Sequence, residues 1–546
     1  MKTGVRRKTV FCVLSALLLM LCFAACSQEG DVNTEQNDTY DTSRYISAIE
    51  DEPDTVDFQS TTIFYTIATN VFDRLVETET DENGDAQIVP SLAESWDISP
   101  DGLTYTFHLR DDVKFSNGSP LTASDVQYSF KRLLTYPESC NQSIVRIIKG
   151  ADRLESGKTD ELEGFIVLGD YDFLITLEEP FGAFLASLSV PGASIMDEET
   201  TSKVNDTFGK DAESTIGTGP YILTKWEPAS GMTLKANKDC WSGAPENEGL
   251  DLRFMEDPED EIALFEDGGL DVLALEEIGN SAEFFIHGDM YKDRLWYVNR
   301  LGIEYIALNE SIEPLDDVRV RKALQLALNR EALLEAVYSG RGQVENGIFP
   351  HGLYGFDPDL PEIPYDSEKA RSLLAEAGYP EGFDLTISMK SSSSQWEGTL
   401  MKLAASMWEE IGVNAKIKML EESDFMSLRK TGKLECYTAL WTADYNDPEN
   451  FINTFFGDEQ STTYRSLCYP RKKIMKRVQG ALKILDQEKR LKEYWDLEKI
   501  IVQDDAAWVP LFSRQWLYVT SDRIDGIHAT WNGSVKNNYR QISLKE

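Results

Sequence analysis

Hydrophobic and polar positions alternate between residues 103 and 109, and this alternation predicts a half-buried β-strand. Apolar side chains occupy every second position from Leu103 to Leu109, and polar side chains stand between them. A period of two brings alternate side chains of a strand to one face. Asp101-Gly102 and Asn117-Gly118, dipeptides typical of tight turns, stand before and after this stretch.

Other segments have the helical period. Thr122 and Asp125 resemble a capping box at the start of one apolar stripe, and Asp316 and Asp317 precede a second stripe, where acidic residues favour a helix start. Gly378 follows a third stripe and provides its end. The predicted helices cover residues 122–134, 316–328, 367–377 and 400–411, with two more between 474 and 502.

Stretches typical of strands separate these helices and indicate an α/β protein. They lie at residues 302–308, 383–389, 413–419, 434–442 and 508–520. The 546-residue chain is too long for one simple core, so we expect two or three domains.

The N-terminus has the features of a bacterial lipoprotein signal. Four basic residues lie within the first eight positions, an uncharged apolar run extends from Val10 to Ala25, and Cys26 follows two alanines. We therefore expect a signal peptide over residues 1–25 and a lipid on Cys26. Residues 26–44 are almost entirely polar after the cysteine, so we expect a flexible tether.

Charge and cysteine content limit the possible partners. The formal net charge is −41, and removal of the four basic residues of the signal would leave 49 − 94 = −45. Such an acidic surface would repel nucleic acid. The four cysteines after Cys26 show no metal-binding spacing, and a core of this size needs no disulfide, so we expect free, buried thiols at Cys140, Cys240, Cys436 and Cys468.

Motifs of enzymes are missing from the sequence. There is no G-x-S-x-G, the four histidines are scattered singly, and Ser156-Gly157-Lys158-Thr159 has Asp152 where a phosphate-binding loop requires glycine. We expect no catalytic residue, no metal site and no cofactor.

The most informative segment is W-T-A-D-Y-N-D-P-E-N-F at residues 441–451. It resembles the signature of the family 5 solute-binding proteins, the extracytoplasmic peptide-binding components of ABC importers. Further stretches resemble the same family in the same order along the chain. They are EPDTVDF at 52–58, NVFDRLVE at 70–77, PSLAESW at 90–96, residues 101–126, GTGPY at 217–221, NKDCW at 237–241, residues 314–330 and ARSLLAEAGYP at 370–380.

The resemblance implies a fold and a domain arrangement. The expected fold is the two-lobed periplasmic-binding-protein type II fold of cluster C. The first lobe would comprise residues 45–300 plus 515–546, with an extra subdomain at about 79–194, and the second lobe residues 301–514. Two crossing segments near 301 and 515 would form the hinge.

The resemblance also implies a peptide site. Asp444 would bind the α-ammonium group, Trp441, Thr442, Ala443 and Tyr445 would border the ligand, and Arg429 would meet its carboxylate end. A broadly specific receptor must recognise backbone and charged ends, so we expect the peptide to add as a strand beside residues 440–443. We also expect the Asp444 carboxylate to be buried.

The leading hypothesis is a monomeric receptor on the outer face of a bacterial cell membrane. It would pass oligopeptides to permease subunits served by separate ATPase subunits. Alternatives are the same fold with a nickel chelate, sugar or opine, a peptide-pheromone sensor, and a secreted hydrolase.

Overall fold

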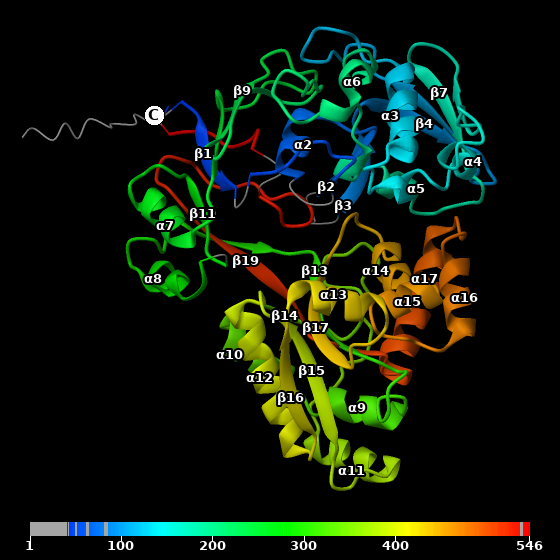
Figure 1. Cartoon of the computed structure of the whole chain (residues 1–546), viewed down its shortest axis with the longest axis vertical. Helices are drawn as coiled ribbons and strands as arrows, with labels where there is room; N and C mark the ends of the chain where they lie inside the picture. Colours follow the sequence, from blue (N-terminus) through cyan, green and yellow to red (C-terminus); the bar gives the residue numbers. More distant parts are fainter. Residues whose placement is uncertain are drawn as a thin grey trace, which may run out of the picture. The chain divides into compact units, whose positions relative to one another are not determined.

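The computed structural model describes residues 41, 43–49, 52–61, 65–80, 86–276, 278–535 and 539–545. Residues Ser43–Glu546 form one compact unit. The predicted signal peptide, Cys26 and most of the predicted tether lie outside the described residues. The fold is mixed α/β with two lobes, as predicted (Figure 1).

The first lobe contains a four-stranded sheet in the order β1-β10-β9-β8. β1 is parallel to β10, and the other pairs are antiparallel. The buried carboxylate of Asp271 accepts the backbone N–H of Ile46 in β1 at 2.9 Å. The elements here are β1 (Tyr45–Ile49), α2 (Tyr65–Val71), β8 (Tyr221–Glu227), β9 (Gly231–Ala236) and β10 (Gly249–Phe254).

A second, antiparallel sheet of the first lobe has the order β4-β5-β7-β6. The strand predicted from alternation is β5, in which Tyr105, Phe107 and Leu109 are buried and the residues between them are not. The Thr122 backbone N–H donates to the Asp125 carboxylate at 2.8 Å at the start of α3, so the predicted helix start is confirmed. β2 (Val76–Thr80) and β3 (Ala86–Pro90) pair in a separate two-stranded sheet. The other elements are β4 (Ala93–Ile98), β5 (Thr104–Leu109), α3 (Ala123–Thr135), α4 (Ala151–Glu155), β6 (Phe165–Val167), β7 (Asp172–Thr176), α5 (Phe184–Ser187) and α6 (Glu198–Val204).

The G-T-G-P-Y stretch has a packing role. A Cβ on Gly217 would lie 2.0 Å from the Val71 carbonyl oxygen at the end of α2, and one on Gly219 would lie 2.7 Å from the Val71 carbonyl carbon. Only glycine permits this approach of two backbones.

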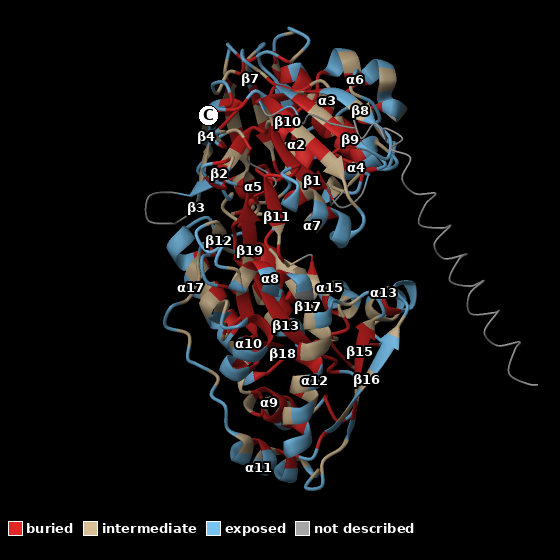
Figure 2. Ribbon diagram, turned by 90° about the vertical axis from the view of Figure 1, so that its left-hand side faces the viewer, coloured by how far each residue is buried: buried red, intermediate tan, exposed pale blue. Residues whose placement is uncertain are grey.

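The second lobe is built on a five-stranded sheet in the order β16-β15-β17-β13-β18. All seven residues of β13 are buried, with Ile306 and Leu308 in one apolar cluster and Tyr305 and Ala307 in another (Figure 2). The sheet therefore has a core on each face. Its strands are β13 (Gly302–Leu308), β15 (Asp384–Lys390), β16 (Asn414–Leu420), β17 (Cys436–Thr442) and β18 (Trp508–Pro510). The strands predicted at 302–308, 383–389, 413–419 and 434–442 are confirmed, but the single strand predicted at 508–520 is wrong, because β18 covers only its first residues.

Helices cover both faces of this sheet. α11 ends at Gly378, which has a φ of 99°, as the sequence predicts. The helices are α9 (Val318–Leu326), α10 (Arg330–Tyr338), α11 (Ser367–Ala377), α12 (Gln395–Glu410), α13 (Glu422–Lys430), α14 (Glu449–Phe456), α15 (Glu459–Tyr464), α16 (Lys472–Ala481) and α17 (Gln487–Glu498), which runs into a π-helical turn (Lys499–Asp504).

One long strand, β19 (Phe512–Thr520), pairs with elements of both lobes. Its first residues pair with β14 (Gly342–Val344), and its later residues pair with β11 (Val272–Ala274) and β12 (Leu295–Asn299). Between β12 and β13 the chain passes from the first lobe to the second. The first lobe also contains α7 (Pro258–Glu266), which packs against β11, and α8 (Ala282–His287) (Figure 1).

Cys140, Cys240, Cys436 and Cys468 are free. The expectation of burial is correct for Cys240 and Cys436. It is wrong for Cys140, which is exposed, and Cys468 is half-buried.

Candidate ligand site

β17 has one open edge at its C-terminal end. On one side, β13 pairs with β17 along the whole length of β17. On the other side, β15 pairs with β17 only at Cys436. The Ala443 N–H donates to the Leu301 carbonyl at 2.9 Å. In an antiparallel pair the backbone groups alternate in direction, so those of Ala443 and of every second residue before it point toward β13. The backbone groups of Leu440 and Thr442 consequently point to the other edge, where no strand of the described residues pairs with them.

Asp444 follows the end of this edge and has an exposed side chain. Its carboxylate accepts the Asn450 amide N–H at 3.0 Å, and its own backbone N–H donates to the Asn450 side-chain oxygen at 3.0 Å. The expectation of a buried carboxylate is therefore wrong. Surrounding protein nevertheless desolvates the carboxylate and raises its pKa, which the Asn450 hydrogen bond and the Arg465 charge oppose.

Tyr65 of α2 brings the first lobe close to Asp444. Burial is the main cause that raises the pKa of Tyr65, and the negative charge of Asp444 is a further one. The two side chains are therefore near enough to interact electrostatically although 379 positions separate them. This proximity places the carboxylate on the side of the second lobe that faces the first.

The neighbours of Asp444 have defined contacts. The Trp441 ring meets Phe455 edge-on with centroids 5.6 Å apart, and its buried Nε1–H has no hydrogen-bond partner in the described part of the chain. Ala443 is buried. The Tyr445 hydroxyl is hydrogen-bonded to Glu449, so it is already occupied.

Thr442 is tied to the segment that connects the lobes. The Arg300 Nε–H donates to the Thr442 hydroxyl at 2.9 Å. The Cζ of Arg300 lies 4.7 Å from the centroid of the Trp516 ring. Arg300 and Trp516 line a cavity of about 340 Å³ together with Glu276. Burial raises the pKa of Glu276 to about 7, although the charges of Arg514 and Arg300 oppose this.

Two arginines, Arg429 and Arg465, lie 5.7 and 5.9 Å from the centroid of the Tyr464 ring, and one of them contacts Trp441. Arg429, in the last turn of α13, is half-buried, and its Nε–H is buried without a partner among the described residues. Arg465 follows α15 and stacks on Trp441, with its Cζ 4.9 Å from the ring centroid. Sequence reasoning missed Arg465, because no motif connects position 465 with position 444.

A cavity of about 780 Å³ is lined in part by Asn446, two residues after Asp444, and both lobes contribute to its walls. Gly182 and Leu185 line it from the first lobe, and Asn446, Asp447 and Arg490 from the second. The Arg490 guanidinium forms a buried, two-pronged ion pair with Asp447, with Nη2–Oδ2 2.5 Å and Nη1–Oδ1 3.1 Å. Since this pair neutralises itself, the cavity offers space and not a free charge.

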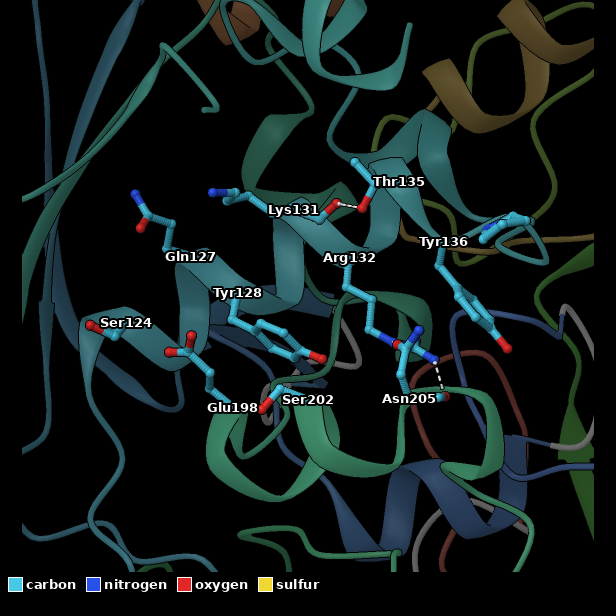
Figure 3. A pocket seen from close by; sticks show the side chains of 11 residues that line it. Ser124, Gln127, Tyr128, Lys131, Arg132, Thr135, Tyr136, Glu198, Ser202 and Asn205 are labelled. Atoms are coloured by element: carbon cyan, nitrogen blue, oxygen red, sulfur yellow. Dashed lines mark hydrogen bonds between the residues drawn. The ribbon is translucent and has the colours of Figure 1, made fainter. Parts of the chain in front are cut away.

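Another cavity, of about 530 Å³, lies along α3 (Figure 3). Figure 3 shows Arg132 turned toward Asn205, to which its Nε–H donates at 3.1 Å. Arg132 also forms a buried ion pair with Asp57 at 2.7 Å. Its charge is therefore compensated within the first lobe, and we assign this cavity no ligand.

The described residues offer no obvious metal centre, since no three His, Cys, Asp or Glu side chains among them are grouped to hold an ion. Within the same residues no helix is long and apolar enough to cross a membrane.

The two lobes, joined by crossing segments, define the class of the protein: it has the periplasmic-binding-protein type II fold. The family model for bacterial extracellular solute-binding proteins, family 5, matches residues 87–463, and the chain belongs to this family. The predicted family and fold are confirmed.

Similar proteins carry related names. The chain is 28% identical to heme-binding protein A of Haemophilus influenzae over 479 residues, covering 84% of each chain. It is 29% identical to the dipeptide-binding protein of Escherichia coli over 468 residues, covering 82% of this chain and 84% of the other. The solved structure of HbpA2 from Haemophilus parasuis matches with a TM-score of 0.77 at 27% identity, over 92% of this chain and all of that one.

Proposed function

We propose that this protein is the peptide-binding component of an ABC importer and that it captures oligopeptides between its lobes. The observation that carries this proposal is the open edge of β17 beside Asp444. An extended peptide added to this edge would hydrogen-bond the free backbone groups of Leu440 and Thr442. The relative named dipeptide-binding protein supports the same ligand class.

Asp444 would fix the register of the peptide by pairing with its α-ammonium group. Every unmodified peptide has this group, so the contact is compatible with broad side-chain specificity. Trp441 and Ala443 would form the adjoining wall, and Tyr445 would hold Glu449 behind it. Arg429 would lie toward the carboxylate end. The role is binding and delivery, and we assign no catalytic residue.

We propose the lobe boundaries expected from the sequence. The first lobe is 45–300 plus 515–546, its extra subdomain is about 79–194, and the second lobe is 301–514. The change of strand partners along β19 supports a hinge near residues 301 and 515. Closure would then be a rotation about two extended segments, driven by a ligand that contacts both lobes.

Thermal shift measurements with matched peptides test the ligand class. A free tripeptide should raise the melting temperature, and its N-acetylated form should raise it far less, because acetylation removes the charge that Asp444 pairs with. Equal stabilisation by the two forms would contradict ammonium recognition. Intact peptide recovered after incubation, shown by mass spectrometry, separates binding from hydrolysis.

We also propose that Cys26 carries a lipid that anchors the protein outside the cell membrane, where it would serve permease subunits with separate ATPases. Residues 1–26 fit this in sequence. Cys26→Ala should abolish labelling by a radioactive fatty acid and release the protein from the membrane fraction. Retention of label after this substitution would contradict the assignment.

Heme is the second candidate ligand, because one of the relatives above is named a heme-binding protein. Hemin titration followed by visible absorption distinguishes the two cargoes. Saturable binding of hemin with no response to free peptides would favour heme.

A further inference from the structure

Three cations surround the exposed ring of Tyr464. The Cζ of Arg429, the Nζ of Lys430 and the Cζ of Arg465 lie 5.7, 5.5 and 5.9 Å from its centroid. We call these three residues the basic cluster. In a chain with 94 acidic and 53 basic residues, cations usually find acidic partners. Yet none of the three forms an ion pair with any described residue.

Part of this unmatched charge is buried. Arg429 and Arg465 are both half-buried, and the Arg429 Nε–H is buried with no acceptor among the described residues. The Arg465 Nε–H donates to the Thr454 carbonyl at 3.1 Å, which leaves its two terminal amino groups for another partner. Burial lowers the pKa of Arg465, and the nearby Arg429 charge lowers it further. Such charges are costly without a counter-ion, so an incoming anion would stabilise them.

The basic cluster is continuous with the surface around Asp444. Arg465 stacks on Trp441, three residues before Asp444, and its charge acts on the Asp444 carboxylate. α13, α15 and β17, which carry these residues, lie together in both ribbon views (Figures 1 and 2). One acidic group and three basic groups therefore border the open end of β17.

We propose that the basic cluster is the anion-binding end of the peptide site and selects short peptides that carry an acidic side chain. This inference rests on the proposed function. Once Asp444 pairs with the α-ammonium, the three cations remain. A terminal carboxylate compensates one of them, and a side-chain carboxylate would compensate a second. Two extended residues span only about 7 Å, so a dipeptide holds both carboxylates near one end. Guanidinium groups suit carboxylates because their paired N–H groups match both oxygens.

Calorimetry with Ala-Glu and Ala-Gln tests the proposal, because the two peptides have nearly the same shape and differ by one charge. The wild type should bind Ala-Glu about tenfold more tightly than Ala-Gln. The ratio should fall toward one in Arg465→Gln and in Arg429→Gln, and Arg465→Lys should retain part of it. Arg371→Gln, which changes an exposed arginine that contacts the Glu410 carbonyl, is the matched control and should keep the full ratio.

The melting temperature of each variant checks folding. Arg429→Gln is the safer variant, since the Arg429 side chain forms no hydrogen bond within the described part of the chain. A wild-type ratio of about one, or a ratio unchanged in both variants, would overturn the inference and leave the proposed function intact. If free and N-acetylated peptides alike fail to bind the wild type, the proposed function fails, and this inference with it.

Discussion

The Arg300 Nε–H donates to the Thr442 hydroxyl at 2.9 Å, and this bond joins the segment between the lobes to the strand that ends beside Asp444. Arg300 lies between β12 of the first lobe and β13 of the second. Thr442 is the last residue of β17, and its backbone groups face the open edge. A movement of the connecting segment would therefore displace Thr442, at the edge of β17 where we place the ligand.

Thr442→Val should weaken peptide binding about three- to tenfold. The substitution removes a hydrogen bond to a charged group, which contributes about 1.5 to 3 kcal/mol, and we expect part of this free energy to be lost from the peptide complex. Calorimetry with one tripeptide measures the change. Thr438→Val is the control, since its hydroxyl on the same strand donates to the Tyr305 carbonyl at 3.2 Å and lies away from Arg300. Equal losses of affinity in the two variants would show that the Arg300 contact has no special role.

Asp444→Asn should weaken binding of free peptides by tenfold or more, because the amide cannot pair with an ammonium group. Binding of the N-acetylated peptide should change little. Asp424→Asn, on the exposed face of α13, is the control. Unchanged affinity for the free peptide in Asp444→Asn would remove this residue from the site.

The pH dependence of peptide affinity should also trace to Asp444. Desolvation raises the pKa of its carboxylate above the ordinary value of 3.8. Pairing requires the ionised form, so affinity should fall as the pH drops through this raised pKa, at a higher pH than for an ordinary aspartate. The fall should be absent in Asp444→Asn. A variant that keeps the wild-type profile would assign the titration to another group.

The fold was predictable where the pattern of residues is local. β5 follows from alternation, and α11 from its apolar stripe and Gly378. Residues 508–520 were predicted as one strand, but Leu511 separates β18 from β19, and these two strands belong to different sheets. A local pattern cannot identify the strand partner.

The candidate site was predictable only through family resemblance. That resemblance led to Asp444, but it did not indicate that the carboxylate is exposed. It also did not indicate Arg465, which reaches Trp441 because the chain turns after α15. Such contacts depend on tertiary packing, and the spacing of residues in the sequence does not predict them.

Glu498→Gln should stabilise the protein increasingly as the pH rises from 5 to 8. Burial raises the pKa of Glu498 to about 8, although the N–H groups of Phe349 and Ile348 oppose the shift. The unfolded chain releases this proton near pH 4.5, while the folded chain keeps it until about pH 8, so the wild type loses stability across that range. Glutamine has no proton to lose and avoids the loss.

The measurement is the difference in melting temperature between Glu498→Gln and wild type, which should grow up to pH 8 and then level off. Glu488→Gln, an exposed position on the same helix that pairs with Lys492, should show no such growth. A difference that stays constant between pH 5 and 8 would show that Glu498 ionises normally in the folded protein.

Arg490→Met should reduce the free energy of unfolding by about 3 to 5 kcal/mol, because it leaves the buried Asp447 carboxylate without its counter-ion. The expected loss is large because both side chains are almost fully buried, at 1% and 4% exposure. Arg477→Met is the matched control: Arg477 contacts Glu493 and Asp496 near the surface, and such pairs contribute about 1 kcal/mol or less. Urea unfolding measures both.

The double variant Arg490→Met with Asp447→Leu should recover much of the loss, because no buried charge then remains. Arg490 also packs over Gly182, where an added Cβ would lie 3.2 Å from the Arg490 side chain. If the double variant is no more stable than Arg490→Met, the loss of this packing and not the stranded charge causes the destabilisation.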